Sequence, residues 1–139
     1  MRVFIQVKNA GKRRPALEKR AYDLPDGIAT LRELIHAVVD AEVAAYNAKG
    51  VDAAVTRFLT ESDMAEGAAQ GKIGFGTIYA DKQADAAKAR ETALQAFADG
   101  LFRCFVNEEE RSALAGEAGV SEGDTLTFVR FTFLSGRLW

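Results

Sequence analysis

The chain has 139 residues, of which 48% are hydrophobic and 27% charged, a size and composition typical of one globular domain. A net charge of −2 argues against a dedicated nucleic-acid binder, which normally carries a basic surplus. The single cysteine, Cys104, rules out an internal disulfide framework and a thiolate metal cage. The N-terminus lacks the apolar run of a signal peptide, and no stretch has the length of apolar sequence that crosses a bilayer. We therefore expect one cytoplasmic domain over residues 1–139, with neither nucleic acid nor a membrane as partner.

The chain is expected to begin with a hairpin of two strands. Residues 2–8 alternate apolar and polar side chains, which is typical of a strand with one buried face. A turn signal follows at residues 9–12, and residues 15–24 then return as a second, more polar strand. The first 20 residues carry seven Lys and Arg against one acid, so the tip of this hairpin is basic.

A helix over residues 30–49 is the clearest element in the sequence. Thr30 and Glu33 have the form of a capping box, with a hydroxyl at the cap and a carboxylate three residues later. Apolar residues recur at helical spacing along the segment, and Gly50 suits a left-handed C-terminal cap. These signals predict an amphipathic helix that packs one face on the core.

Residues 51–100 are interpreted as an insertion with two helices. Residues 60–63 can start a short helix that stops at Gly71. Residues 85–99 predict a second, alanine-rich helix, and its small side chains imply close packing against a flat surface.

The C-terminal part predicts a strand over residues 101–106, an acidic loop over 107–123 and a final strand over 125–134. The final strand is apolar on both faces, so we expect it at the centre of the sheet. Arg130 interrupts it, and its charge is expected to pair with an acid of the preceding loop.

Two parts of the sequence resemble a known superfamily. Residues 22–35 resemble the strand-to-helix junction of ubiquitin-like proteins and of the small bacterial sulfur carriers for molybdopterin and thiamine. Residues 105–108 and 123–128 resemble the carriers' valine-asparagine strand and their glycine-aspartate turn into the last strand. The chain is thus similar to the β-grasp (ubiquitin-like) superfamily over about residues 1–49 and 101–136. The resemblance implies an α+β fold, with a mixed sheet packed on one main helix and a helical insertion.

The C-terminus departs from the sulfur-carrier pattern. Carriers of this family end in a glycine pair whose free carboxylate is adenylated. Here Gly136 stands at the place of the first glycine, Arg137 follows it, and the chain ends at Trp139. Carrier chemistry would therefore require trimming to Gly136, because the bulky end cannot enter a channel built for glycine.

The glycine-dense loop at residues 71–76 suggests a phosphate loop but lacks its form. Lys72 comes too early and no hydroxyl residue follows it, so the ordinary interpretation is a turn that needs positive φ angles. A small-anion site at Lys72 is the alternative. His36 has no second histidine beside it and Cys104 has no assignable base, so we assign no catalytic residue, no metal ligand and no cofactor.

We predict a non-catalytic ubiquitin-like domain that binds a protein partner through its exposed sheet or its C-terminal segment. Two alternatives stay open: a modifier or sulfur-carrier precursor trimmed to Gly136, and a small enzyme or anion-binding protein that uses the 71–76 loop. The residues expected to bind are Lys72, Gly74, Gly76, Arg130, Gly136, Arg137 and Trp139.

Overall fold

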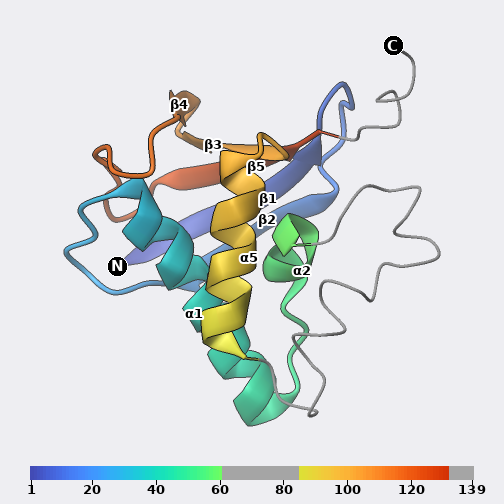
Figure 1. Cartoon of the computed structure of the whole chain (residues 1–139), viewed down its shortest axis with the longest axis vertical. Coiled ribbons are helices and arrows are strands. Elements are labelled where there is room, and N and C mark those ends of the chain that lie inside the picture. The colour runs from blue at the N-terminus through green and yellow to red at the C-terminus, as the bar shows by residue number, and fades with distance from the viewer. Residues whose placement is uncertain (61–84, 132–139) are drawn as a thin grey trace.

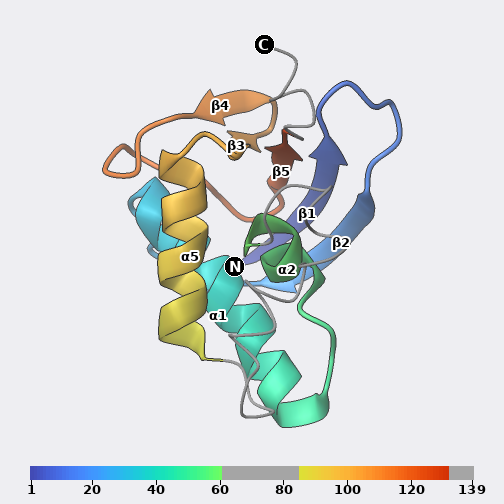
Figure 2. The ribbon, with the colours of Figure 1, turned by 45° about the vertical axis from the view of Figure 1, so that its right-hand side comes forward.

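The structure is a computed structural model that describes residues 1–60 and 85–131, and these residues form an α+β fold (Figure 1). A five-stranded mixed sheet carries the described helices on one of its faces (Figures 1 and 2). The predicted fold class is thereby confirmed. In chain order the elements are β1 (Arg2–Asn9), β2 (Leu17–Asp23), α1 (Leu31–Lys49), α2 (Ala54–Thr60), α5 (Ala86–Ala98), β3 (Phe102–Val106), β4 (Glu109–Arg111) and β5 (Thr125–Arg130).

The strands lie in the order β2-β1-β5-β3-β4. β1 and β5 run parallel, whereas the three other neighbouring pairs are antiparallel. The final strand is therefore central, as its apolar content predicted, and β2 and β4 form the two edges. Only one face of β5 is fully buried: Leu126 and Phe128 point toward the helices, while Thr127 and Val129 lie half-buried on the opposite face.

The predicted caps of α1 are confirmed. The Thr30 side chain accepts a hydrogen bond from the backbone N–H of Glu33, and Glu33 Oε1 accepts from the N–H of Ala29 at 2.8 Å. Gly50 ends the helix with φ at 71° and donates its N–H to the carbonyl of Tyr46. Although α1 has 19 residues, none of the described helices is long and apolar enough to cross a membrane.

The core fills the space between the sheet and α1. Phe102 and Phe128 are its largest fully buried side chains, and their rings meet edge to face with centroids 5.9 Å apart. From α5, the buried side chains are Ala89, Ala93 and Ala96, so that helix can approach closely. Its main neighbours are α1 and α2 rather than the flat surface expected from the alanines.

Two short elements differ from the expectation. α2 occupies residues 54–60 and ends where a short helix was expected to start; the rest of that expected helix, up to Gly71, lies outside the described residues. β4 lies inside the segment predicted as a loop. Its three residues are charged, so their sequence carries no strand signal, and β4 exists because a tight turn folds it back on β3.

That turn has two residues, Asn107 and Glu108, with φ angles of 49° and 77°. Positive φ at both central positions is the requirement of a type I′ hairpin turn. The Asn107 side chain donates to Asp124 Oδ1 and accepts from the N–H of Thr125, which ties the turn to the start of β5. Glu108 contributes no comparable bond among the described residues, so its left-handed backbone is uncompensated strain.

We expect Glu108→Gly to raise the free energy of unfolding by about 0.5 kcal/mol, because relief of roughly 1 kcal/mol of strain exceeds the entropy cost of the glycine. Urea denaturation followed by circular dichroism measures the change. The matched control is Glu110→Gly in β4, where glycine has no strain to relieve and should cost about 0.5–1 kcal/mol. Equal losses for both variants would contradict the strain at Glu108.

Candidate functional site

Of the residues predicted to bind, the structure describes Arg130 alone. Those outside the described residues are Lys72, Gly74, Gly76, Gly136, Arg137 and Trp139.

Arg130 points from the end of β5 toward the helices and is only 8% exposed. Its Nη1 donates to the carbonyl of Phe58 at 3.0 Å, and its guanidinium carbon lies 5.5 Å from the centroid of the Phe58 ring. The acidic segment lies at the other end of β5, where Asn107 bonds Thr125. None of the described acids of that segment forms an ion pair with Arg130, so the expected pairing was wrong. Arg130 instead joins β5 to α2.

Cys104 and His36 show no sign of reactive or metal-binding geometry. Cys104 is fully buried in β3, and burial raises the pKa of its thiol to about 12, so it stays protonated at neutral pH. For His36, partial burial and the nearby Arg90 guanidinium lower the pKa. Within residues 1–60 and 85–131, no three His, Cys, Asp or Glu side chains are grouped to hold a metal ion.

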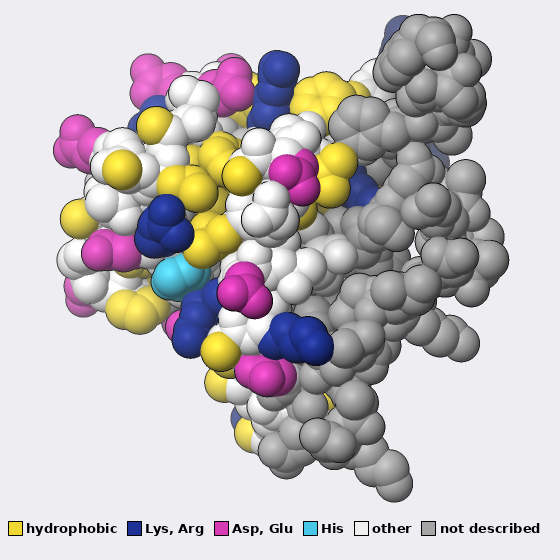
Figure 3. All heavy atoms as spheres, in the orientation of Figure 1, with side chains coloured by type: hydrophobic (Ala, Val, Ile, Leu, Met, Phe, Trp, Pro, Cys, Tyr) yellow, Lys and Arg dark blue, Asp and Glu magenta, His cyan; other side chains and the backbone are white. Residues whose placement is uncertain are grey.

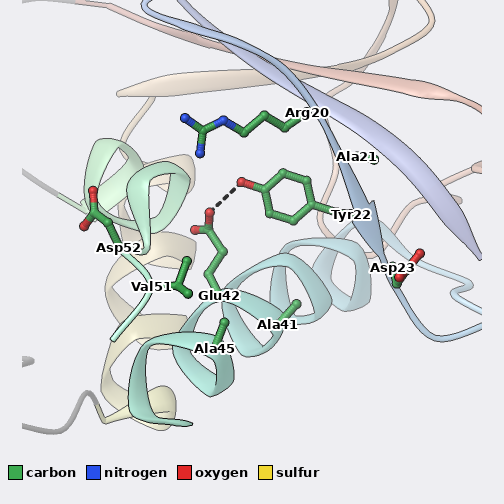
Figure 4. Close-up of a pocket in the computed structure, with 9 residues that line it drawn as sticks. All are labelled: Arg20, Ala21, Tyr22, Asp23, Ala41, Glu42, Ala45, Val51 and Asp52. Carbon is green, nitrogen blue, oxygen red and sulfur yellow. Dashed lines mark hydrogen bonds between the residues drawn. The ribbon is translucent and has the colours of Figure 1, made fainter. Parts of the chain in front are cut away.

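A hollow of about 350 Å³ opens between β2, α1 and the connection from α1 to α2 (Figure 4). Tyr22 and Glu42 form its inner wall, and Arg20 and Asp52 lie at its rim. The carboxylate of Glu42 is 5% exposed and sits where the apolar stripe of α1 faces the core. An acid at a position of the apolar stripe is the sequence signal for this buried carboxylate.

Glu42 is held by four hydrogen bonds from three other residues. Its Oε1 accepts from the backbone N–H and the hydroxyl of Thr56, both at 2.7 Å. Its Oε2 accepts from the Tyr22 hydroxyl at 2.7 Å and from the N–H of Val55 at 3.2 Å. The Tyr22 pKa is raised, first by burial and then by the charge of Glu42.

These bonds give Glu42 a structural role. Val55 and Thr56 lie in the first turn of α2, and their N–H groups have no partner within that helix, so Glu42 caps α2 from a different helix. Both carboxylate oxygens are fully used. Neither oxygen of Glu42 is left without a hydrogen-bond donor for a ligand in the hollow to replace.

The face of the sheet opposite the helices is the second candidate surface, here called the open face. No described helix lies on it. Gln6 of β1 and Thr127 of β5 are neighbours there, joined by a hydrogen bond of 3.0 Å between Gln6 Nε2 and Thr127 Oγ1. Two shallow hollows of about 260 and 310 Å³ share these two residues and Glu108. Phe105 and Val129 line the larger hollow.

Basic side chains surround the apolar part of the open face. Lys8 and Lys19 border the two hollows on the β1 and β2 side. On β3, Arg103 lies 5.0 Å from the centroid of the Phe131 ring and 3.7 Å from the carboxylate of Glu110. On the helix side of the molecule acidic and basic side chains are instead interleaved (Figure 3). The open face thus combines half-buried aromatic side chains with a border of Lys8, Lys19 and Arg103 together with Glu108 and Glu110.

Comparison with known proteins gives this chain no family. No family model matches the sequence, no curated protein is significantly similar to it, and no solved structure matches its fold.

Proposed function

We propose that the chain is a β-grasp (ubiquitin-like) domain without catalytic activity of its own, which works by binding a protein partner through the open face. The strand order supports the fold assignment: two outer antiparallel pairs flank the parallel pair β1 and β5, and the longest described helix follows the first hairpin. α2 and α5 fall between α1 and β3, where the sequence predicted an insertion.

The observation that carries the binding proposal is the apolar centre of the open face. Phe105 of β3 and Val129 of β5 lie diagonally across the two strands and line the same hollow, and both side chains are half-buried although no described element covers them. Aromatic side chains in shallow depressions with a polar rim are the usual anchors of protein interfaces. The same geometry on a flat sheet offers little enclosure for a small-molecule substrate.

The charges indicate the kind of partner. Lys8, Lys19 and Arg103 border the centre; of these three, Arg103 forms an ion pair with a described acid, Glu110, and Glu108 also lines both hollows. A partner segment with one or two large apolar side chains and flanking Asp or Glu fits this arrangement. Such complementarity raises the association rate and makes binding sensitive to salt.

Site-specific photo-crosslinking tests the proposal in cells that produce the chain. A photoreactive phenylalanine analogue replaces Phe105 on the open face in one variant and Lys88 on the exposed side of α5 in the matched control. We expect a defined protein adduct from position 105 and none from position 88. Adducts to the same proteins from both positions, or none from position 105, would refute binding through the open face.

The captured protein then allows an affinity measurement. We expect Phe105→Ala to weaken binding by at least about tenfold, the loss typical of an anchoring aromatic residue, while Lys88→Ala leaves affinity unchanged. Both variants must keep the wild-type circular dichroism spectrum. If Phe105→Ala is folded and binds with unchanged affinity, Phe105 does not anchor the partner and the proposed binding through the open face is wrong.

A further inference from the structure

The outer edge of β2 carries backbone groups directed away from the sheet. Met1 and Leu24 exchange both N–H to carbonyl hydrogen bonds at 2.8 Å, so they form a hydrogen-bonded pair of the antiparallel ladder. Such pairs alternate along the ladder, which makes Ala21 and Asp23 members of the non-bonded pairs. Their N–H and carbonyl groups therefore point outward, at an edge that no described strand covers.

We propose that this edge pairs with the same edge of a second copy of the chain, antiparallel and with the twofold axis at Ala21. A twofold interface requires a self-complementary surface. Centring on Ala21 places Lys19 opposite Asp23 of the partner subunit, and the symmetry repeats that opposite-charge pair. Within its own chain Asp23 pairs with Arg2 at 3.0 Å, and it is exposed enough to accept a second cation. Ala21 lies opposite itself, where its small side chain permits close approach of the two backbones. β2 contains no proline, and its ladder with β1 is regular from Arg20 to Asp23; the register shifts between Arg20 and Leu17, next to Lys19.

The hollow beside the edge gives the second argument. In the same register, Arg20 of the partner subunit lies next to Tyr22, on the helix side of the joined sheets. That side opens into the hollow of about 350 Å³, whose rim carries Asp52 (Figure 4). Arg20 lines the hollow of its own copy and makes no ion pair among the described residues, whereas Asp52 pairs with Arg57 at 2.6 Å with both side chains about half exposed; Arg20 of the partner subunit can join that exposed pair.

The charges also select this register over its nearest competitor. A pairing centred one residue earlier would place two Arg20 side chains opposite each other, and like charges directly opposite are destabilising. Lys19 and Arg20 would likewise discourage pairing with a basic strand of another protein. The dimer would use Lys19 at the border of the open face but not Phe105 or Val129 at its centre.

Charge exchange tests the register. Sedimentation equilibrium should give twice the mass of one chain for the wild type, with a dissociation constant below about 1 mM. Lys19→Asp and Asp23→Lys should each weaken the dimer by at least about tenfold, because symmetry applies every new repulsion twice. An equimolar mixture of the two variants restores both attractive pairs, so it should regain the wild-type affinity as a heterodimer.

Ala21→Pro is the backbone test. Its N–H points outward, so proline leaves the ladder with β1 intact while blocking the new one, and the dimer should be lost. A wild-type chain that stays monomeric up to about 1 mM overturns the proposal. So does a dimer that persists in Ala21→Pro, or a mixture of charge variants that remains monomeric. Circular dichroism of each variant verifies folding, and the charge variants decide the matter if Ala21→Pro does not fold.

Discussion

Replacing Glu42 with alanine is expected to lower the free energy of unfolding by about 3 kcal/mol. The substitution leaves the N–H groups of Val55 and Thr56 and the hydroxyl of Tyr22 without their acceptor in a largely buried site. Each unsatisfied buried donor costs about 1–3 kcal/mol, and water entering from the hollow offsets part of that loss. Urea denaturation monitored by circular dichroism gives the number.

Two milder substitutions at the same bonds calibrate this result. Glu42→Gln keeps the shape and one acceptor oxygen but turns an amide toward the donors, so about 1–2 kcal/mol should be lost. Tyr22→Phe removes a single hydrogen bond and should cost about 1 kcal/mol. The matched control is Asp40→Asn on the same helix, whose pair with Arg90 is partly exposed and contributes less than about 1 kcal/mol.

Glu42→Ala should destabilise α2 locally as well as lower the free energy of unfolding of the whole chain. α2 has seven residues, too short to be stable by itself, and no acid in its own first turn. Amide hydrogen exchange at Val55 and Thr56 should therefore accelerate in Glu42→Ala more than exchange in α5. A Glu42→Ala variant as stable as Asp40→Asn would show that the cap on α2 has no energetic importance.

Elements with local signals could be predicted from the sequence. α1 begins at a hydroxyl and a carboxylate three residues apart and ends at a glycine with positive φ, so both of its boundaries are encoded within the helix. β5 was predicted at the centre of the sheet because its apolar content demanded burial.

Elements whose signal lies elsewhere in the chain could not be predicted in this way. The cap of α2 comes from Glu42, so no residue at the start of α2 marks its beginning. β4 is made a strand by the turn at Asn107 and Glu108 and by the β3 partner beside it. Acids close to Arg130 in sequence suggested an ion pair, but the direction of β5 carries Arg130 to the opposite end of the strand.

The candidate surfaces depend on strand order, which local patterns do not contain. Alternation along β1 and β3 shows that Phe4 and Phe105 share a face with polar residues, but not that β5 lies between these strands. The hollow beside β2 likewise joins residues about 20 positions apart, Tyr22 and Glu42. Only the tertiary arrangement creates either surface.

The neighbouring residues Phe128 and Val129 are expected to differ in role, because Phe128 faces the core and Val129 faces the open face. Phe128 is fully buried on the helix side of β5, beside Cys104 and Val7 in the two flanking strands and in edge-to-face contact with Phe102. Phe128→Ala should lower the free energy of unfolding by about 4 kcal/mol, from lost apolar burial plus the cavity left behind. Chemical denaturation of the variant and of the wild-type protein measures that loss.

Val129→Ala, one residue later, removes two methyl groups from the open face and should cost only about 1 kcal/mol, because that side chain is half-buried and its surroundings can relax. The same variant should weaken binding to a partner captured at position 105, since Val129 lines the hollow beside Phe105. Adjacent residues of one central strand would then divide into a stability position and a binding position. If Val129→Ala instead destabilised the chain as much as Phe128→Ala, the open face would be a covered part of the core, and binding through it would be excluded.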